Sequence, residues 1–233
     1  MAKLKVAQCW DDGVATDIRL IEMLRKYNAK ATFNLCPGTH ADERVEPSRA
    51  PEGFTGWSYK GFRGGKVGMK ELVDIYGDFE VASHCWKHEV AGHCPDDVFI
   101  KAAVDAKKFL EDTFQKECRG FVYPCGGHTP ATEQMLRDAG FVYARTTDTT
   151  FDVTACTNTM AFAANCHFAA EDFKERFEKA HEVGAFYFWG HSYEMMDQQE
   201  LWDAFEDKLR MICEDPDVEW VSVADIAALC KQV

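Results

Sequence analysis

Short apolar runs alternate with longer amphipathic segments along most of the chain, and this alternation restricts the folds that the sequence can adopt. Seven runs have the length of strands, at residues 4–10, 31–36, 79–84, 119–124, 141–146, 185–191 and 218–222. Apolar residues at helical spacing lie between these runs. They begin at about residue 16, and they also occur at 69–76, from 95 to about 114, and at 130–139, 171–183, 198–213 and 223–230. Strands that alternate with helices are typical of parallel sheets. About seven βα units favour a barrel, closed or nearly so, over an open doubly wound sheet. The sequence contains no glycine-rich phosphate loop that would favour the doubly wound sheet.

Nothing in the sequence divides the chain into separate domains. We therefore expect one α/β domain over residues 1–233, with a loop insertion at about 38–68. That segment carries seven glycines, two prolines and the aromatic residues Phe54, Trp57, Tyr59 and Phe62. Such a loop suits a sugar-binding wall, and it equally suits an insertion packed on its own hydrophobic cluster. Residues 147–170 also lack a regular pattern.

Composition limits the partners and the compartment that we expect. The formal charge of −13 disfavours a nucleic-acid partner, because a polyanion would be repelled. No apolar run is long enough for a transmembrane helix, so we expect no membrane partner. The start, MAKLKVAQCWDD, lacks the apolar stretch of a secretory signal, which leads us to expect a cytoplasmic protein. The ten cysteines include no CxxC pair and are expected to be reduced and mostly buried, with a disulfide framework as the alternative.

Polar residues gather where the predicted strands end. Five strands are closed or followed by residues that can carry chemistry, namely Asp11, Asp12, His84, His88, Cys125, Gly126, Arg145 and His191. Barrel enzymes carry out their chemistry at the carboxyl ends of the strands. The sequence therefore predicts an active site at this end of the barrel.

Asp12, His84 and His88 offer two imidazoles and a carboxylate, which together could hold a metal ion and leave coordination positions open. Asp11 then remains as a candidate base, and Gly13 permits the turn that both aspartates need. Each element also has a simpler interpretation. Paired aspartates are favoured at the start of a helix. The HxxxH pair, which would share one face of a helical turn capped by Ser83, could instead be two surface histidines or one buried histidine.

His191 ends a strand that is apolar almost throughout. A histidine there can be a hydrogen-bonded core residue. It can also be a general acid whose pKa is set by its surroundings, which a hydrolase needs in order to expel an amine or alkoxide.

Four motifs in order resemble those of the polysaccharide deacetylases of carbohydrate esterase family 4, which share the NodB homology domain. The motifs are CWDDG at 9–13, HCWKH at 84–88, VYPCGG at 122–127 and FWGHS at 188–192. Their order and spacing fit the family from about residue 4 to 225. The resemblance implies a distorted (β/α)7 TIM-like barrel and a metal-dependent removal of acyl groups, usually N-acetyl, from amino sugars.

The resemblance also implies roles for individual residues. Asp11 would be the base, His191 the acid, and Asp12, His84 and His88 the metal ligands.

Further roles concern the shape of the site. The backbone amide of Cys125 would stabilise the oxyanion, and Arg145 would orient Asp11. Substrate contacts are expected from Tyr123, Pro124, Gly126 and Trp57.

Two positions depart from the family pattern. Val122 stands where many members have an arginine, so Arg145 would have to supply that contact with Asp11. Cys85 replaces a serine or threonine whose hydroxyl often steadies the histidine loop.

These observations predict a hydrolase that uses one divalent metal ion to deacylate an amino sugar or oligosaccharide. Zinc is the first expectation for the metal, and iron, cobalt or nickel suit the same ligands. Three alternatives stay open: a hydrolase of a non-sugar C–N amide bond, a carbohydrate-binding protein without turnover, and a non-haem iron oxygenase. The substrate would then be an acetylated sugar or a small amide. Oligomeric state is left open.

Overall fold

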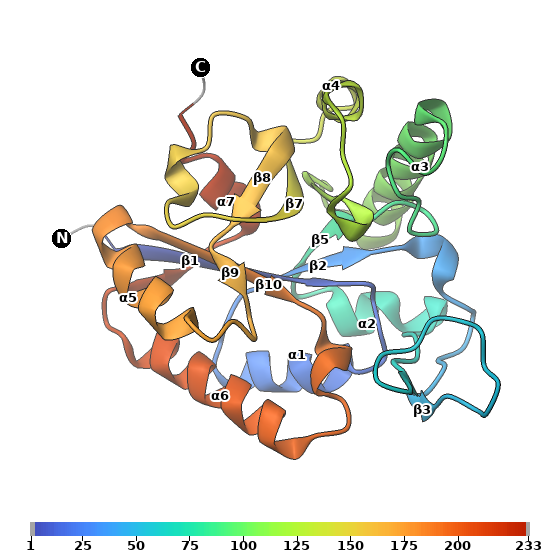
Figure 1. The fold of residues 1–233 in the computed structure, drawn as a ribbon, viewed down its shortest axis with the longest axis horizontal. Helices are drawn as coiled ribbons and strands as arrows, with labels where there is room; N and C mark the ends of the chain where they lie inside the picture. The colour runs from blue at the N-terminus through green and yellow to red at the C-terminus, as the bar shows by residue number, and fades with distance from the viewer. Residues whose placement is uncertain (1–2, 232–233) are drawn as a thin grey trace.

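The computed structural model describes residues 3–231, and within this range its main sheet has nine strands, all parallel (Figure 1). They are β1 (Leu4–Asp11), β2 (Thr32–Leu35), β5 (Glu80–Ser83), β6 (Gly120–Val122), β7 (Tyr143–Thr149), β8 (Phe162–Ala164), β9 (Cys166–His167), β10 (Ala185–Gly190) and β11 (Val218–Trp220). Their order in space is β8-β7-β6-β5-β2-β1-β10-β9, and β11 pairs with the start of β1. The sheet curls into a nearly closed barrel in a single domain, as the sequence predicts.

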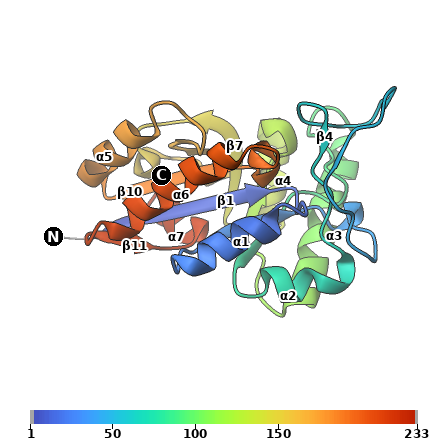
Figure 2. The ribbon, with the colours of Figure 1, turned by 90° about the horizontal axis from the view of Figure 1, so that it is seen from below.

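Helices surround this sheet (Figure 2). They are α1 (Asp17–Lys26), α2 (Leu72–Tyr76), α3 (Asp96–Phe114), α4 (Pro130–Asp138), α5 (Phe173–Val183), α6 (Gln199–Glu214) and α7 (Val223–Ala227). Short 3₁₀ turns complete the chain: η1 (Pro37–Thr39), η2 (Met69–Glu71), η3 (Pro124–Gly126), η4 (Val153–Ala155), η5 (Thr159–Ala161) and η6 (Ser192–Met195). Between residues 3 and 231, no helix combines the length and apolar character needed to cross a membrane.

Strand β1 shows how the sequence divides the two faces of the barrel wall. Val6 and Trp10 point into the core under the surrounding helices, while Ala7 and Cys9 belong to a second apolar cluster inside the barrel. This follows from the two-residue period of a strand. The same period places Asp11, two residues after Cys9, on the inner face at the carboxyl end of the strand.

Asn165 closes the seam between the two ends of the sheet. It lies between β8 and β9, fully buried. Its amide nitrogen donates to the carbonyls of Thr150 and Phe151 at 3.2 and 3.1 Å, and its side-chain oxygen accepts from the backbone N–H of Tyr187 in β10 at 2.7 Å. One side chain thus substitutes for the strand pairing that a fully closed barrel would have.

The sequence prediction is incomplete over residues 147–170. Strand β7 continues to Thr149, and the two short strands β8 and β9 follow where an irregular segment was expected. Each has only two or three residues, which is too short for a two-residue hydrophobic period to be recognised.

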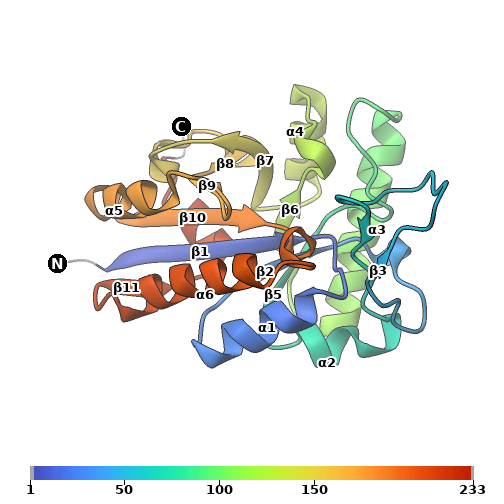
Figure 3. The ribbon, with the colours of Figure 1, turned by 60° about the horizontal axis from the view of Figure 1, so that its bottom comes forward.

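Residues 38–68 extend from the carboxyl end of the barrel. They contain a small antiparallel pair, β3 (Ser48–Arg49) and β4 (Phe62–Arg63), which is separate from the main sheet. Figure 3 shows the arrowheads of β1 and β10 pointing toward the end of the molecule where this segment lies. The segment is therefore placed to form a wall beside any site at the carboxyl ends of the strands.

Candidate active site

A cleft of about 670 Å³ opens at the carboxyl ends of the strands. It is lined from both sides, by the barrel and by the segment 38–68. Its lining includes nine residues that the sequence singles out, namely Asp11, Asp12, Trp57, His84, His88, Tyr123, Cys125, Arg145 and His191. Side chains that are up to 180 positions apart in the sequence therefore share one cavity.

Asp11 is held by two partners at the bottom of the cleft. Asn34 lies on β2 directly beside Asp11, and its Nδ2 donates to Asp11 Oδ1 at 2.7 Å. Arg145 forms a buried ion pair with Asp11 Oδ2. Burial alone would raise the pKa of Asp11, but Arg145, with His84, His191 and Asn34, outweighs burial and lowers it to about 2. Asp11 is therefore an ionised, oriented carboxylate at neutral pH.

Asp12 sits in a tight turn with a left-handed backbone, at a φ of 81°. Such a conformation is unfavourable for a residue with a Cβ, although aspartate tolerates it better than most. The turn is fixed by the Asp12 N–H, which donates to the Asn34 carbonyl at 3.0 Å, and by Lys66, whose amine donates to the Asp12 carbonyl. The turn directs Asp12 away from Asp11, so neighbouring aspartates can take separate roles.

Gly13 completes this turn at a φ of +64°. A Cβ there would lie 2.7 Å from a ring carbon of His40, so both the backbone and the space require glycine.

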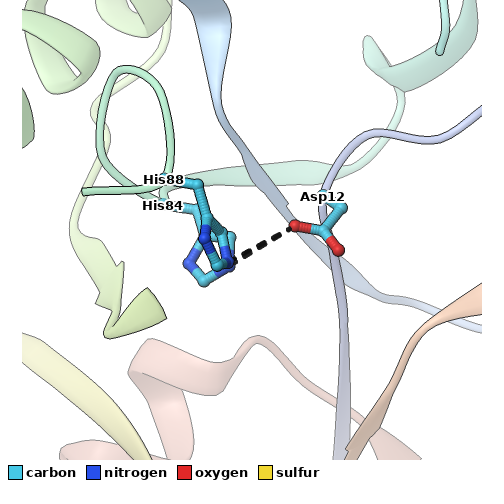
Figure 4. A group of neighbouring side chains, drawn as sticks. All are labelled: Asp12, His84 and His88. Atoms are coloured by element: carbon cyan, nitrogen blue, oxygen red, sulfur yellow. Dashed lines mark ion pairs between the residues drawn. The ribbon is translucent and has the colours of Figure 1, made fainter. Parts of the chain in front are cut away.

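His84 and His88 flank a short turn after β5 (Figure 4). The expected helical turn is wrong: Cys85 and His88 have positive φ values of 61° and 66°, and Ser83 donates its hydroxyl to the Ala103 carbonyl instead of capping a helix. The turn still brings the rings together, with their centroids 4.8 Å apart.

The imidazole of His84 is prepared to act as a ligand. Its Nδ1 lies 2.8 Å from the Val122 carbonyl, an acceptor that requires the proton on Nδ1 and leaves the lone pair on Nε2. Burial lowers the pKa of His84 to about 4, so the ring is neutral at physiological pH.

The donor set fits a divalent cation. Oδ1 of Asp12 lies 3.7 Å from His84 Nε2 and 3.9 Å from His88 Nε2, and the three ligand atoms are all within 4.8 Å of one another. Atoms bound to one zinc at about 2.0–2.2 Å lie a little closer together than this, so a small adjustment of the side chains would complete the site. In Figure 4 both imidazoles are directed toward the Asp12 carboxylate. Two imidazoles and one carboxylate suit zinc, iron, cobalt or nickel.

His191 lies beside Asp11. Its Nε2 is 3.8 Å from Asp11 Oδ2, and its Nδ1 is 3.4 Å from Oε1 of Glu194. Burial alone would lower the pKa of His191, but Glu194, Asp11 and Asp12 outweigh it and raise the pKa above its ordinary value. The ring therefore favours the protonated form, as a proton donor requires.

The segment that carries His191 is anchored to α1. Ser192 donates its hydroxyl to the buried carboxylate of Asp17 and lies 2.7 Å from the Thr16 hydroxyl. Because Ser192 follows His191 directly, this buried contact fixes the backbone from which the imidazole extends.

Cys125 occupies a turn between β6 and α4 with a φ of 55°. The turn packs so tightly on β7 that a Cβ on Gly126 would lie 2.3 Å from the Thr147 hydroxyl. Gly126 therefore lets the Cys125 backbone reach the cleft. Pro124 is buried, and neither it nor Gly126 lines the cleft; both shape the turn.

An aromatic group forms the outer wall of the cleft. Trp57 is 58% exposed and packs edge-on against Tyr193 with ring centroids 4.8 Å apart. Tyr59 also packs against Tyr193, with ring centroids 5.5 Å apart. Tyr123, directly after β6, lines the cleft and donates its hydroxyl to the Met160 carbonyl.

Asn34, Glu194 and His167 lie near the reactive groups, although none of them belongs to the four motifs. Asn34 had a signal, because it is a polar residue in a strand that is otherwise mostly apolar. Glu194 lies three residues after His191, a spacing that indicates contact only where a helical turn is expected, and the 3₁₀ turn η6 that brings the two together was not predicted. His167 reaches the site only through the short strand β9, which the sequence did not predict.

A family model described as polysaccharide deacetylase matches residues 1–144. The chain belongs to the polysaccharide deacetylase family. The family membership that the four motifs predict is therefore confirmed. Arg145, His167, His191 and Glu194 follow the matched segment, so this match says nothing about them.

Solved structures share this fold at low sequence identity. A putative polysaccharide deacetylase from Mycobacterium smegmatis has a TM-score of 0.62 at 14% identity, with 98% of this chain and 90% of that chain covered. A family 4 acetyl xylan esterase from Clostridium thermocellum, in complex with a cobalt ion, has a TM-score of 0.54 at 16% identity, with 97% and 91% covered. The Streptococcus pyogenes deacetylase PplD, in complex with acetate, has a TM-score of 0.52 at 18% identity over 66% of this chain, and the match spans only 61% of that protein. A search of curated proteins gave no match.

Proposed function

We propose that this protein is a metal-dependent hydrolase that removes an N-acetyl group from an amino sugar within an oligosaccharide. The main support for this proposal is that Asp12, His84 and His88 converge next to a second carboxylate, Asp11, which the metal site does not need as a ligand. A metal site alone needs only the first three residues. The additional pairing of Asp11 with Arg145 and of His191 with Glu194 favours acid–base hydrolysis over simple binding.

Asp12, His84 and His88 would hold the divalent ion. Such an ion supplies Lewis acidity, which lowers the pKa of water and polarises a carbonyl oxygen. These three side chains line the cleft, and with only three protein ligands the ion would keep coordination positions free for water or substrate.

Asp11 is the base in this proposal. Its low pKa keeps it ionised, and its contacts with Asn34 and Arg145 hold the carboxylate in one orientation. It would accept a proton from the attacking water as that water adds to the acetyl carbonyl carbon.

His191 would then donate its proton to the departing sugar nitrogen. The backbone N–H of Cys125 would stabilise the negative charge on the carbonyl oxygen, a contribution on the order of 3 kcal/mol for one such donor in other enzymes. The products are acetate and a free amine.

The outer wall supports an oligosaccharide as substrate. Trp57 exposes more than half of its surface at the mouth of the cleft, where an aromatic face can pack against a sugar ring next to the reacting one. A small amide would leave this wall unused.

The decisive experiment measures acetate release from a panel of N-acetylated and O-acetylated sugars of different length, with zinc, cobalt or iron(II) added. The proposal expects release of acetate that depends on added metal and falls by about 10²–10⁴-fold in Asp11→Asn, with the metal content of the variant unchanged. Equal activity of Asp11→Asn and the parent protein would remove Asp11 from the reaction. Sugar binding without acetate release would favour a binding protein, and oxygen consumption with an oxo-acid would favour an oxygenase.

A further inference from the structure

A second group of side chains, His167, His191 and Glu194, lies beside the catalytic residues. Glu194 is between the two histidines: its Oε2 is 2.9 Å from His167 Nε2, and its Oε1 is 3.4 Å from His191 Nδ1. The three come from β9, from the end of β10 and from η6. Neither His167 nor Glu194 belongs to the four motifs at 9–13, 84–88, 122–127 and 188–192.

Two interpretations of this group are possible, because histidines and a carboxylate at such distances could also bind a cation. The tautomer of His167 distinguishes them. The backbone N–H of Ala169 donates to His167 Nδ1 at 3.3 Å, so Nδ1 carries the lone pair and Nε2 carries the proton. A metal ion at Nε2 would require the opposite arrangement. His167 therefore carries its proton on Nε2, the atom that lies 2.9 Å from Oε2 of Glu194.

The environment of Glu194 supports this assignment. Burial alone would raise the pKa of Glu194, but His167 and His191 outweigh burial and lower it to about 2. Oε2 of Glu194 and Nδ1 of His191 are buried, and neither has an aligned hydrogen bond in this structure. Leaving such atoms unpaired is costly, and a small rotation of the carboxylate would satisfy both.

We propose that His167 is a positioning residue, which holds the Glu194 carboxylate against Nδ1 of His191 and so directs Nε2 of His191 toward the substrate. This inference rests on the proposed role of His191 as the acid. Without a donor at position 167, Glu194 would keep only its contact with His191 and could turn toward the open cleft. His191 would then be buried without its nearest carboxylate, and its proton would be held less strongly.

Several groups face His191, and the test has to account for them. They are Asp11 and Asp12 after β1, Lys66 beside Asp12, Arg145 on β7, His167 on β9, and Tyr193 and Glu194 on η6. A substitution at 167 leaves all the others in place. It therefore reports on the link through Glu194.

The test compares His167→Phe with His167→Gln. Phenylalanine keeps a ring between Phe168 and Trp189, whose centroids lie 4.7 and 4.8 Å from that of His167, but it has no donor. Glutamine replaces the ring yet can donate an amide N–H from about the place of Nε2. A purely structural role for the ring would make glutamine the more harmful change, whereas the proposal predicts the reverse.

In His167→Phe we expect the alkaline limb of the kcat/KM profile to move to lower pH by about one unit, and kcat to fall about tenfold with little change in KM. His167→Gln should keep the parent profile. Equal profiles for His167→Phe and the parent protein, or equal losses in the two variants, would overturn the proposal.

A second measurement does not need turnover. The titration of His191 is followed by NMR of protein with ¹⁵N-labelled histidine, and its resonance is assigned with His191→Asn. The proposal expects a lower midpoint in His167→Phe than in His167→Gln or the parent protein, and equal midpoints would contradict it even if no sugar is hydrolysed. Metal analysis completes the test: the bound metal should be the same in all three proteins, and a second equivalent that is lost in His167→Phe would show a metal site instead.

Discussion

Arg145 of β7 reaches across the barrel to Asp11 of β1, 134 positions away in the sequence, and the two form an ion pair that is almost completely buried. The pair occupies the place where the base of the proposed reaction is needed. Val122, on the neighbouring strand β6, stands where the family resemblance leads us to expect an arginine. The guanidinium is thus present in this cleft, but it comes from the next strand of the sheet.

Arg145→Met should impair both folding and activity. Removing the guanidinium leaves a buried carboxylate without its main compensating charge, which costs about 3–5 kcal/mol of unfolding free energy in comparable buried pairs. It also raises the pKa of Asp11, because burial then dominates, so the acidic limb of the activity profile should move to higher pH. Denaturant unfolding and a pH–rate profile measure the two effects. Arg145→Lys, which keeps the charge, should show smaller changes in both.

The same ion pair predicts how stability depends on pH. The pKa of Asp11 is lowered from an ordinary value of 3.8 to about 2 in the folded protein. The stabilisation is therefore present above pH 4 and is lost as the pH falls from about 4 toward 2. Unfolding free energies measured across this window should fall more steeply for the parent protein than for Asp11→Asn. Identical slopes would show that Asp11 is not paired in solution.

His84→Ala or His88→Ala should reduce the bound metal to a small fraction and abolish activity. Each removes one of three protein ligands, and His84 is also held by the Val122 carbonyl on its other nitrogen. The control is His181→Ala, a histidine on α5 that pairs with Asp215. Metal analysis by mass spectrometry measures the result, and full occupancy in either ligand variant would refute the assignment. Treating the parent protein with a chelator should also abolish its activity, and added metal should restore it.

Gly126→Ala should lower activity by one to two orders of magnitude. The added methyl group would collide with Thr147 and displace the turn that carries the Cys125 amide. Gly140→Ala is a matched control, because Gly140 has a similar positive φ of +80° but open space around its Cβ. Both variants carry backbone strain, on the order of 1 kcal/mol, and only Gly126→Ala carries the collision. Similar activities in the two variants would show that the position of this turn does not matter.

Trp57→Ala should raise KM for an oligosaccharide several-fold and leave kcat nearly unchanged. The indole is placed to contact a sugar next to the reacting one. Its loss should therefore weaken the binding of the ground state and of the transition state by the same amount. Activity on a monosaccharide should not change. Phe151→Ala removes another exposed aromatic side chain, outside the residues that line the cleft, and serves as the control. An equal loss on both substrates would place Trp57 in the structure of the wall rather than in sugar binding.

Most of the barrel could be predicted from the sequence because its strands are long enough to show a pattern. The run at 4–10 became β1, and the apolar run at 185–191 became β10, its partner. The motif residues at the ends of these strands were also predictable, since parallel strands bring their carboxyl ends to one edge. The turn at His84–His88 was not, because two residues with positive φ leave no reliable signal when neither is glycine.

The α/β class, the end of the barrel where polar residues gather, and the three candidate ligands could be predicted from the amino-acid sequence, because periodicity and motif spacing are local properties of the chain. Which side chains meet became visible only in the folded protein: Arg145 with Asp11, Glu194 between two histidines, and Asn165 across the seam. These contacts join elements whose separation in space depends on how the sheet curls and on the order of its strands. Neither quantity is encoded in any one segment, so the electrostatic environment of the site emerges only when the barrel closes.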